Sequence, residues 1–157
     1  MDFQIMNEGF PLLSTIVFLP LAGAIILLLL PGENVQRSWT MLVTMLTAAI
    51  SLPLYTGFDS NTAKYQFAEH VSWIPSLDIN YTLGIDGISL LLVLLTTLIM
   101  PLCVLGSWTY IQKRVKEFMV CLLLMETAML GVFMALDFVL FYVLWEAMLI
   151  PMYLLIG

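Results

Sequence analysis

The sequence predicts an all-α, polytopic integral membrane protein with about five transmembrane helices. Three observations lead to this class. Hydrophobic residues make up 62% of the 157 residues and charged residues only 10%, whereas soluble domains carry about 25% charged residues. The mean hydropathy is +1.04. The apolar residues also gather in runs of about 20, the length at which a helix crosses the hydrocarbon core of a bilayer.

The expected elements form one membrane domain over residues 1–157. Its spans are expected at about 12–30, 39–57, 85–108, 118–136 and 138–157. The first span is expected to be retained rather than cleaved as a signal peptide. Asp2 and Glu8 precede it in place of basic residues, and its apolar stretch is too long.

Turn and cap signals separate the spans. The turn sequence PGEN ends the first span. The polar sequence TYIQKRVKE follows the third span, and Asp137 is placed to cap the fifth. Four spans contain a proline, which removes one backbone donor and predicts bent or broken helices. These prolines are Pro20, Pro53, Pro101 and Pro151.

The basic residues predict the orientation of the spans. Four of the five lie in the loops 31–38 and 109–117, and the fifth lies in the loop 58–84. Cytoplasmic loops carry an excess of Lys and Arg. We therefore expect 31–38 and 109–117 to be cytoplasmic, and the loop 58–84 and the N-terminus to face the outer side.

Composition and motifs exclude several classes of function. A net charge of −6 and the absence of a basic cluster argue against binding to nucleic acid. Cys103 and Cys121 lie inside apolar runs, where a cysteine most often packs as a small apolar residue. No CxxC, HExxH, GxGxxG or P-loop pattern occurs. We expect no metal or cofactor in this chain, and the lipid bilayer as its main environment.

Two carboxylates fall inside predicted spans. Glu126 lies in LLLMETAML and Glu146 in VLWEAML. A charged residue at the middle of a membrane helix costs about 2.5 to 3.5 kcal/mol, and all five basic residues are expected in loops. Each carboxyl group is therefore either protonated, or it faces water or a cation from a segment outside this chain. Each lies about eight residues from the start of its helix, roughly 12 Å deep, so both are expected near the midplane.

Glu146 has polar residues along its helix, whereas Glu126 is surrounded by apolar ones. Tyr142 and Tyr153 share a helical stripe with Glu146, and Pro151 frees the carbonyl of Ala147 beside it. These residues favour an exchangeable proton site at Glu146, with Glu126 as a candidate proton relay. The alternative for either glutamate is a protonated group that only hydrogen-bonds a neighbouring helix.

Three segments resemble a known family. They are YTLGIDGISLLLVLLTTLIMPLCVLGSW, LLLMETAMLGVFMALDFVLFYVLWEAMLIPMYLLIG and the loop WIPSLDINY. Together they are similar to the antiporter-like membrane subunits of NADH-quinone oxidoreductase, respiratory complex I, and most to the branch called subunit M in bacteria and subunit 4 in mitochondria. The resemblance covers nearly the whole chain.

The resemblance implies a fold and a mechanism. It implies the N-terminal part of a subunit of about fourteen helices with inverted repeats and broken helices, in a bacterial plasma membrane. The essential glutamate of the family's fifth helix matches Glu146, and it works with a lysine of the seventh helix, outside this chain. The family glutamate that matches Glu126 has a role that the resemblance does not fix.

The resemblance also implies partners. Other membrane-arm subunits, especially the paralogous antiporter-like ones, are expected beside this chain, and FMN and iron–sulfur clusters are expected on partner subunits. Two other functions stay open: a subunit of a multi-subunit cation/proton antiporter, and a truncated, non-transporting membrane protein. The last span runs to Gly157 with no polar flank, so we expect a longer polytopic protein.

Overall fold

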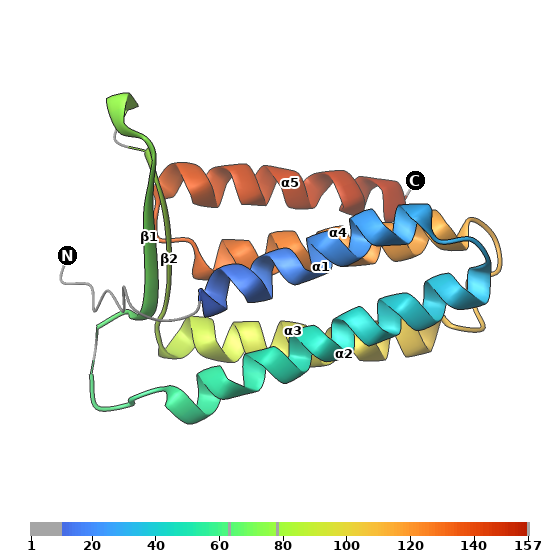
Figure 1. Cartoon of the computed structure of the whole chain (residues 1–157), viewed down its shortest axis with the longest axis horizontal. Helices are drawn as coiled ribbons and strands as arrows, with labels where there is room; N and C mark the ends of the chain where they lie inside the picture. The colour runs from blue at the N-terminus through green and yellow to red at the C-terminus, as the bar shows by residue number, and fades with distance from the viewer. Residues whose placement is uncertain (1–10, 63, 78, 157) are drawn as a thin grey trace.

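The computed structural model describes residues 11–62, 64–77 and 79–156. It shows an antiparallel bundle of five long helices with a β-hairpin across one end (Figure 1). In chain order the elements are α1 (Leu12–Leu29), α2 (Glu33–Gly57), β1 (Gln66–Ile74), the 3-10 turn η1 (Pro75–Leu77), β2 (Ile79–Ile85), α3 (Gly87–Ser107), α4 (Val115–Met134) and α5 (Phe138–Ile156). Asp2, Glu8 and Gly157 lie outside the described residues.

The five expected helices are present, and each is long and apolar enough to cross a membrane. The predicted fold class is therefore confirmed. Helices α1, α2, α3 and α5 each continue through their proline. Helix α2 begins six residues before the span expected at 39–57, and α4 begins three residues before the span expected at 118–136. Arg37 and Lys116 consequently lie in the first turns of helices rather than in loops. The limits of the spans within a bilayer stay predictions, since helix ends and membrane boundaries need not coincide.

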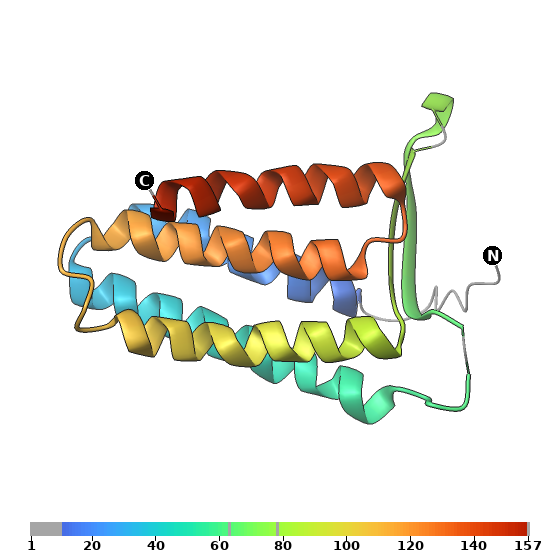
Figure 2. The same ribbon diagram turned by 180° about the vertical axis from the view of Figure 1, so that it is seen from behind.

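Helix α4 lies at the centre of the bundle and α5 at its margin. Helix α4 packs against all four other helices, as Figures 1 and 2 show from opposite sides. In the most apolar stretch of each helix, 56% of the α4 residues are buried but only 11% of those in α5. Most of the α5 surface is therefore free to meet lipid or other protein.

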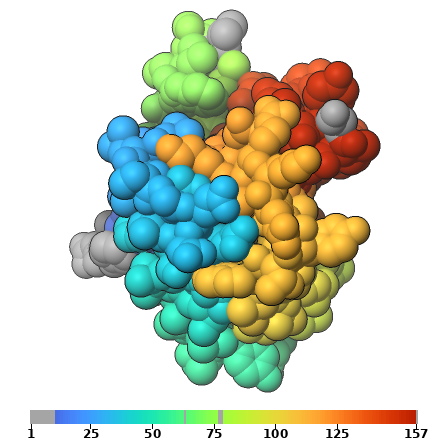
Figure 3. Space-filling view, turned by 90° about the vertical axis from the view of Figure 1, so that its right-hand side faces the viewer, coloured from blue at the N-terminus to red at the C-terminus, as the bar shows by residue number. Residues whose placement is uncertain are grey.

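The two connections expected on one side of the membrane lie together at one end of the bundle, called the loop end below. Arg37 donates a hydrogen bond to the carbonyl of Ile111 at 2.8 Å, and Lys116 donates to the carbonyl of Leu28 at 2.9 Å. Figure 3 looks onto this end, where the connection after α1 lies beside the connection after α3. A cation near the last carbonyls of a helix is favourable because the helix dipole is negative there. Which side of a membrane the loop end faces stays a prediction.

The connection expected at 58–84 contains structure that the sequence reading did not describe. Strands β1 and β2 pair antiparallel in it, with Glu69 opposite Leu83 and His70 opposite Thr82. This hairpin lies across the other end of the bundle, called the hairpin end below (Figure 1). The N–H of Leu136 donates to the carbonyl of Thr82 at 2.9 Å, which ties β2 to the connection between α4 and α5.

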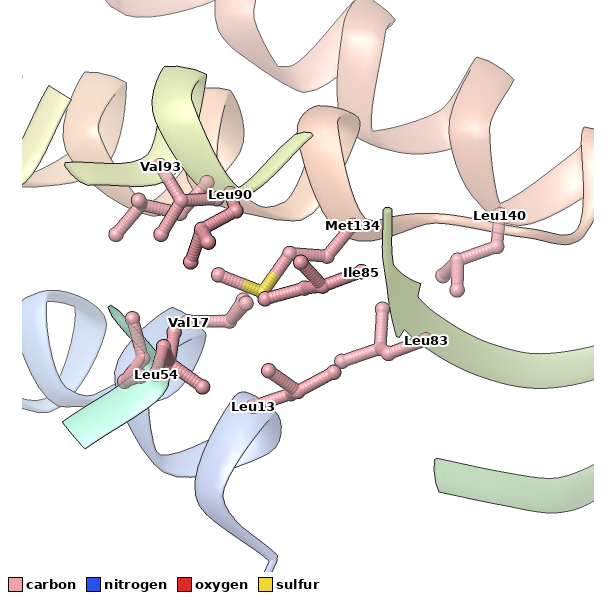
Figure 4. Close-up of a cluster of buried hydrophobic side chains, with 11 residues drawn as sticks. Leu13, Val17, Leu54, Leu83, Ile85, Leu90, Val93, Met134 and Leu140 are labelled. Carbon is pink, nitrogen blue, oxygen red and sulfur yellow. The ribbon is translucent and has the colours of Figure 1, made fainter. Parts of the chain in front are cut away.

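Two apolar clusters form the interior. The hairpin-end cluster joins residues of the helices to β2, and Figure 4 shows Leu83 and Ile85 among them. Its buried members are Leu13, Ile16, Val17, Leu54, Leu83, Ile85, Leu90, Val93, Leu130, Met134 and Leu140. The loop-end cluster has the buried members Ala24, Leu27, Val43, Met100, Val104, Val115, Met119, Leu122 and Leu123. Close packing rather than exclusion from water holds such helices together in lipid.

Candidate functional site

Glu146 lies on the exposed face of α5, near the middle of the helix. Asp137 begins this helix as the sequence predicted, because its Oδ1 accepts the N–H groups of Val139 at 2.8 Å and Leu140 at 3.1 Å. The buried residues of α5 are Leu140 and Pro151. Glu146 lies about 140° around the helix from Pro151, at about 100° per residue. The carboxylate therefore faces away from the bundle.

The residues predicted to lie beside Glu146 occupy both the exposed face and the buried face of α5. Tyr142 and Tyr153 are exposed, as Glu146 is, and all three share the outward face. Glu146, Ala147 and Tyr153 line one shallow groove along this face, together with apolar side chains. Pro151 is buried on the side toward the bundle. The structure thus places a carboxylate and two phenols on a membrane-spanning surface that the described residues leave uncovered.

Glu126 has the opposite environment. Its exposed fraction is 0%, and neither carboxylate oxygen has a hydrogen-bond partner among the described residues. A β-carbon built on Gly131 would lie 2.7 Å from Cδ1 of Leu144, so the Gly131 face of α4 is the one that meets α5. Glu126 lies five residues earlier, about 140° around the helix from that contact. The carboxyl group therefore points toward α1, α2 and α3.

The two glutamates consequently do not form one site within this chain. Counting along the antiparallel helices places them at similar depths, as the sequence predicted. Glu126 faces the bundle interior, however, and Glu146 faces outward from the far side of α5. A direct hydrogen bond between them would have to pass through both helices. Within the described residues, no group of three or more His, Cys, Asp or Glu side chains could hold a metal ion.

A polar network at the hairpin end was not found by sequence reasoning. Glu69 of β1 accepts the N–H of Leu13 at 2.7 Å and the N–H of Ser14 at 3.1 Å. It also accepts the hydroxyl of Ser14, whose oxygen lies 2.9 Å from that of Tyr81. Burial raises the pKa of the Tyr81 phenol above its usual value, and the nearby Glu69 carboxylate adds to this. Glu69 lies 55 residues after Ser14, so no local pattern could have indicated the network.

The five helices, each long and apolar enough to cross a membrane, define the chain as part of a multi-pass membrane protein. Residues 14–135 match the family model described as NADH-ubiquinone oxidoreductase chain 4, amino terminus. This match covers more than half of the chain, so the chain belongs to that family. It includes Glu126 and ends before Glu146.

Individual relatives agree with this family. The chain is 47% identical over 152 residues to NADH-quinone oxidoreductase subunit M of Rhodobacter capsulatus, covering 93% of this chain and 29% of the relative. It is 43% identical over 147 residues to NADH-ubiquinone oxidoreductase chain 4 of Arabidopsis thaliana, covering 92% and 30%. Respiratory complex I from Thermus thermophilus contains a chain with a similar fold, with a TM-score of 0.74 and 30% identity, covering 88% and 27%. The chain thus spans about 30% of the length of these curated relatives.

Proposed function

We propose that this chain is part of a proton-translocating membrane-arm subunit of NADH:quinone oxidoreductase and that Glu146 is its proton site. One observation carries the proposal: α5 presents a carboxylate at mid-helix on its uncovered face. A charged side chain at that depth is costly, and such residues in membrane proteins face a partner charge or a water-filled path.

The positive partner of Glu146 must come from another segment. The basic residues Arg37, Lys64, Lys113, Arg114 and Lys116 lie in connections or in first turns of helices. The chain spans about 30% of its relatives, so the rest of such a subunit is available to cover α5. A lysine on a helix packed there would pair with Glu146, as the family resemblance implies.

The pair would move protons without redox chemistry in this subunit. A carboxylate within about 4 to 6 Å stabilises the charged form of a lysine, and its removal favours release of the lysine's proton. Separation of the pair would thus pass a proton onward. In this proposal FMN and iron–sulfur clusters carry electrons to quinone on partner subunits. Neighbouring membrane-arm subunits would cover part of the bundle surface.

The direction in which the Glu126 side chain points limits its role in this mechanism. Because Glu126 faces α1, α2 and α3, it can act as a relay to Glu146 only through intermediate groups. We therefore assign the exchangeable proton to Glu146 and keep Glu126 as a candidate relay.

Replacement of Glu146 in the complete enzyme tests the proposal. Glu146→Gln keeps the shape of the side chain and removes its exchangeable charge. We expect NADH-driven proton uptake by sealed membrane vesicles to collapse, while NADH oxidation with an artificial acceptor continues. Glu33→Gln is the matched control, because Glu33 is an exposed carboxylate at the start of α2. Normal pumping by the Glu146→Gln enzyme would refute the proposal. Gradient-driven cation exchange that persists without NADH would instead indicate a cation/proton antiporter.

A further inference from the structure

A layer of buried polar side chains separates the two apolar clusters of the interior. On α2 it lies between Val43 of the loop-end cluster and Leu54 of the hairpin-end cluster, and α3 and α4 show the same order. We call this set the polar layer. Its members are Thr44, Thr47 and Ser51 of α2, Thr96 and Thr97 of α3, and Glu126 and Thr127 of α4, all of them buried.

Helix geometry places Glu126 and the α3 members of the polar layer at similar depths. Glu126 is 11 residues from the first residue of α4 at the loop end, or about 16 Å at 1.5 Å per residue. The same rise from the loop end reaches Thr96 on α3. Ser51 and Thr97 join the two helices directly, with their hydroxyl oxygens 2.8 Å apart. The layer therefore crosses the bundle near the middle of its length.

The polar layer has more hydrogen-bond acceptors than donors. Each threonine or serine hydroxyl in it has a carbonyl acceptor on its own helix, at Met41, Val43, Ala48, Leu92, Leu94 or Leu123. Where Ser51 and Thr97 meet, one of the two hydroxyls donates its single hydrogen to the other instead. The lone pairs of these hydroxyl oxygens remain available. Pro101 lies four residues after Thr97 and has no N–H, so the carbonyl of Thr97 lacks its usual helical donor. The layer thus offers acceptors to a group that can donate.

Glu126 must be satisfied inside the bundle. Its carboxyl group is fully buried and unpartnered among the described residues. Because it is already enclosed, a side chain from another segment cannot reach it without separating the helices. The buried residues of α1, α2 and α3 include no ionisable side chain, and Glu146 and Tyr142 of α5 lie on that helix's exposed face. An ionised carboxylate there would be unpaired, which is costly.

We propose that Glu126 carries a proton and binds at least one internal water molecule, which hydrogen-bonds to the oxygen acceptors of Ser51 and Thr97. A protonated carboxyl group and a water molecule both supply the donors that the polar layer lacks. Buried waters typically make about three hydrogen bonds to otherwise unsatisfied polar groups. This site is separate from Glu146, and it stands whether or not Glu146 transports protons.

Infrared spectroscopy of the complete complex in membranes tests the proposal. We expect a C=O stretching band of a protonated carboxyl group in the wild type that is lost in Glu126→Gln, and that shifts when H₂O is replaced by D₂O. Ser51→Ala and Thr97→Val remove acceptors with little change of volume. Each is expected to shift the band, because loss of an acceptor changes how the water molecule hydrogen-bonds to the carboxyl group.

A matched control lies on the same helix. Thr40 is buried and its hydroxyl donates to the carbonyl of Gln36 at 2.9 Å, but it lies eleven residues, about 16 Å, nearer the loop end than Ser51. Thr40→Val should leave the band in place. The amount of assembled complex on a native gel shows that each variant folds.

Three results would overturn the proposal. One is the same carboxyl band in the wild type and Glu126→Gln. Another is an unchanged band in both Ser51→Ala and Thr97→Val. The third is disappearance of the band when Na⁺ is added at constant pH, which would make the polar layer a cation site with an ionised Glu126.

Discussion

The first turn of α1 should open more often when Glu69 is removed. Pro11 stands at the N-cap position of α1, and no side chain at that position makes a capping hydrogen bond. Glu69 of β1 takes this role from across the fold, because it accepts the N–H of Leu13 at 2.7 Å and the N–H of Ser14 at 3.1 Å. Glu69→Ala leaves both donors without this partner.

The expected change in the free energy of local opening can be estimated from these contacts. Loss of an N-cap acceptor costs about 1 kcal/mol. Loss of a negative charge beside the positive end of the helix dipole costs about 0.3 to 1 kcal/mol more. Glu69→Ala should therefore lower the free energy of local opening by about 1.3 to 2 kcal/mol, which is roughly a 10- to 30-fold larger opening constant. Glu69→Gln keeps an oxygen acceptor and loses the charge, so a smaller increase is expected.

Hydrogen–deuterium exchange of the complete complex, read by mass spectrometry over the first turn of α1, measures this opening. Glu117→Gln serves as the control, since Glu117 forms an exposed ion pair with Arg114 far from α1's first turn. Exchange of Leu13 and Ser14 at the wild-type rate in Glu69→Ala would contradict the capping role of Glu69. Equal increases in Glu69→Ala and Glu69→Gln would show instead that the charge alone matters.

Two further predictions concern a helix cap and a close helix contact. The Ser89 N–H donates to Oδ1 of Asp86 at 2.7 Å and holds the pKa of the Asp86 carboxyl below its usual value. A lowered folded-state pKa gives stability that is present above the unfolded-state pKa, about 3.9, and is lost as pH falls through the folded-state pKa. The Tm of the wild type should therefore fall more than that of Asp86→Asn between neutral pH and about pH 3, and parallel pH profiles would contradict this. A β-carbon on Gly23 would lie 2.7 Å and 2.9 Å from the two γ-carbons of Val43, so Gly23→Ala should cost about 1 to 3 kcal/mol of stability. A β-carbon on Gly106 would have nothing within 4 Å, so Gly106→Ala should be neutral or stabilising by up to about 1 kcal/mol. Equal stabilities of the two variants in thermal unfolding would contradict the Gly23 contact.

The amino-acid sequence is sufficient to predict which segments are helical and where Glu126, Glu146 and Asp137 lie along them. A bilayer requires about 20 apolar residues with all backbone groups paired inside the helix, so composition and run length are sufficient to predict the five helices. Asp137 could be recognised as a start signal because a cap acts on the next two or three residues. The depth of Glu126 also follows from counting residues, since the rise per residue is fixed.

The directions in which these side chains face, and the hairpin across one end of the bundle, depend instead on how the helices pack. Glu126 and Glu146 both lie in apolar helices, and both are expected from the sequence near the middle of the membrane. Their environments differ because α4 is packed on all sides, whereas α5 is packed mainly on one side. Whether a side chain is buried or exposed depends on which neighbours its helix contacts. Glu69 caps α1 and Ser51 meets Thr97 across sequence separations of 46 or more residues. Such contacts exist only after the helices have packed, because no local interaction brings these residues together.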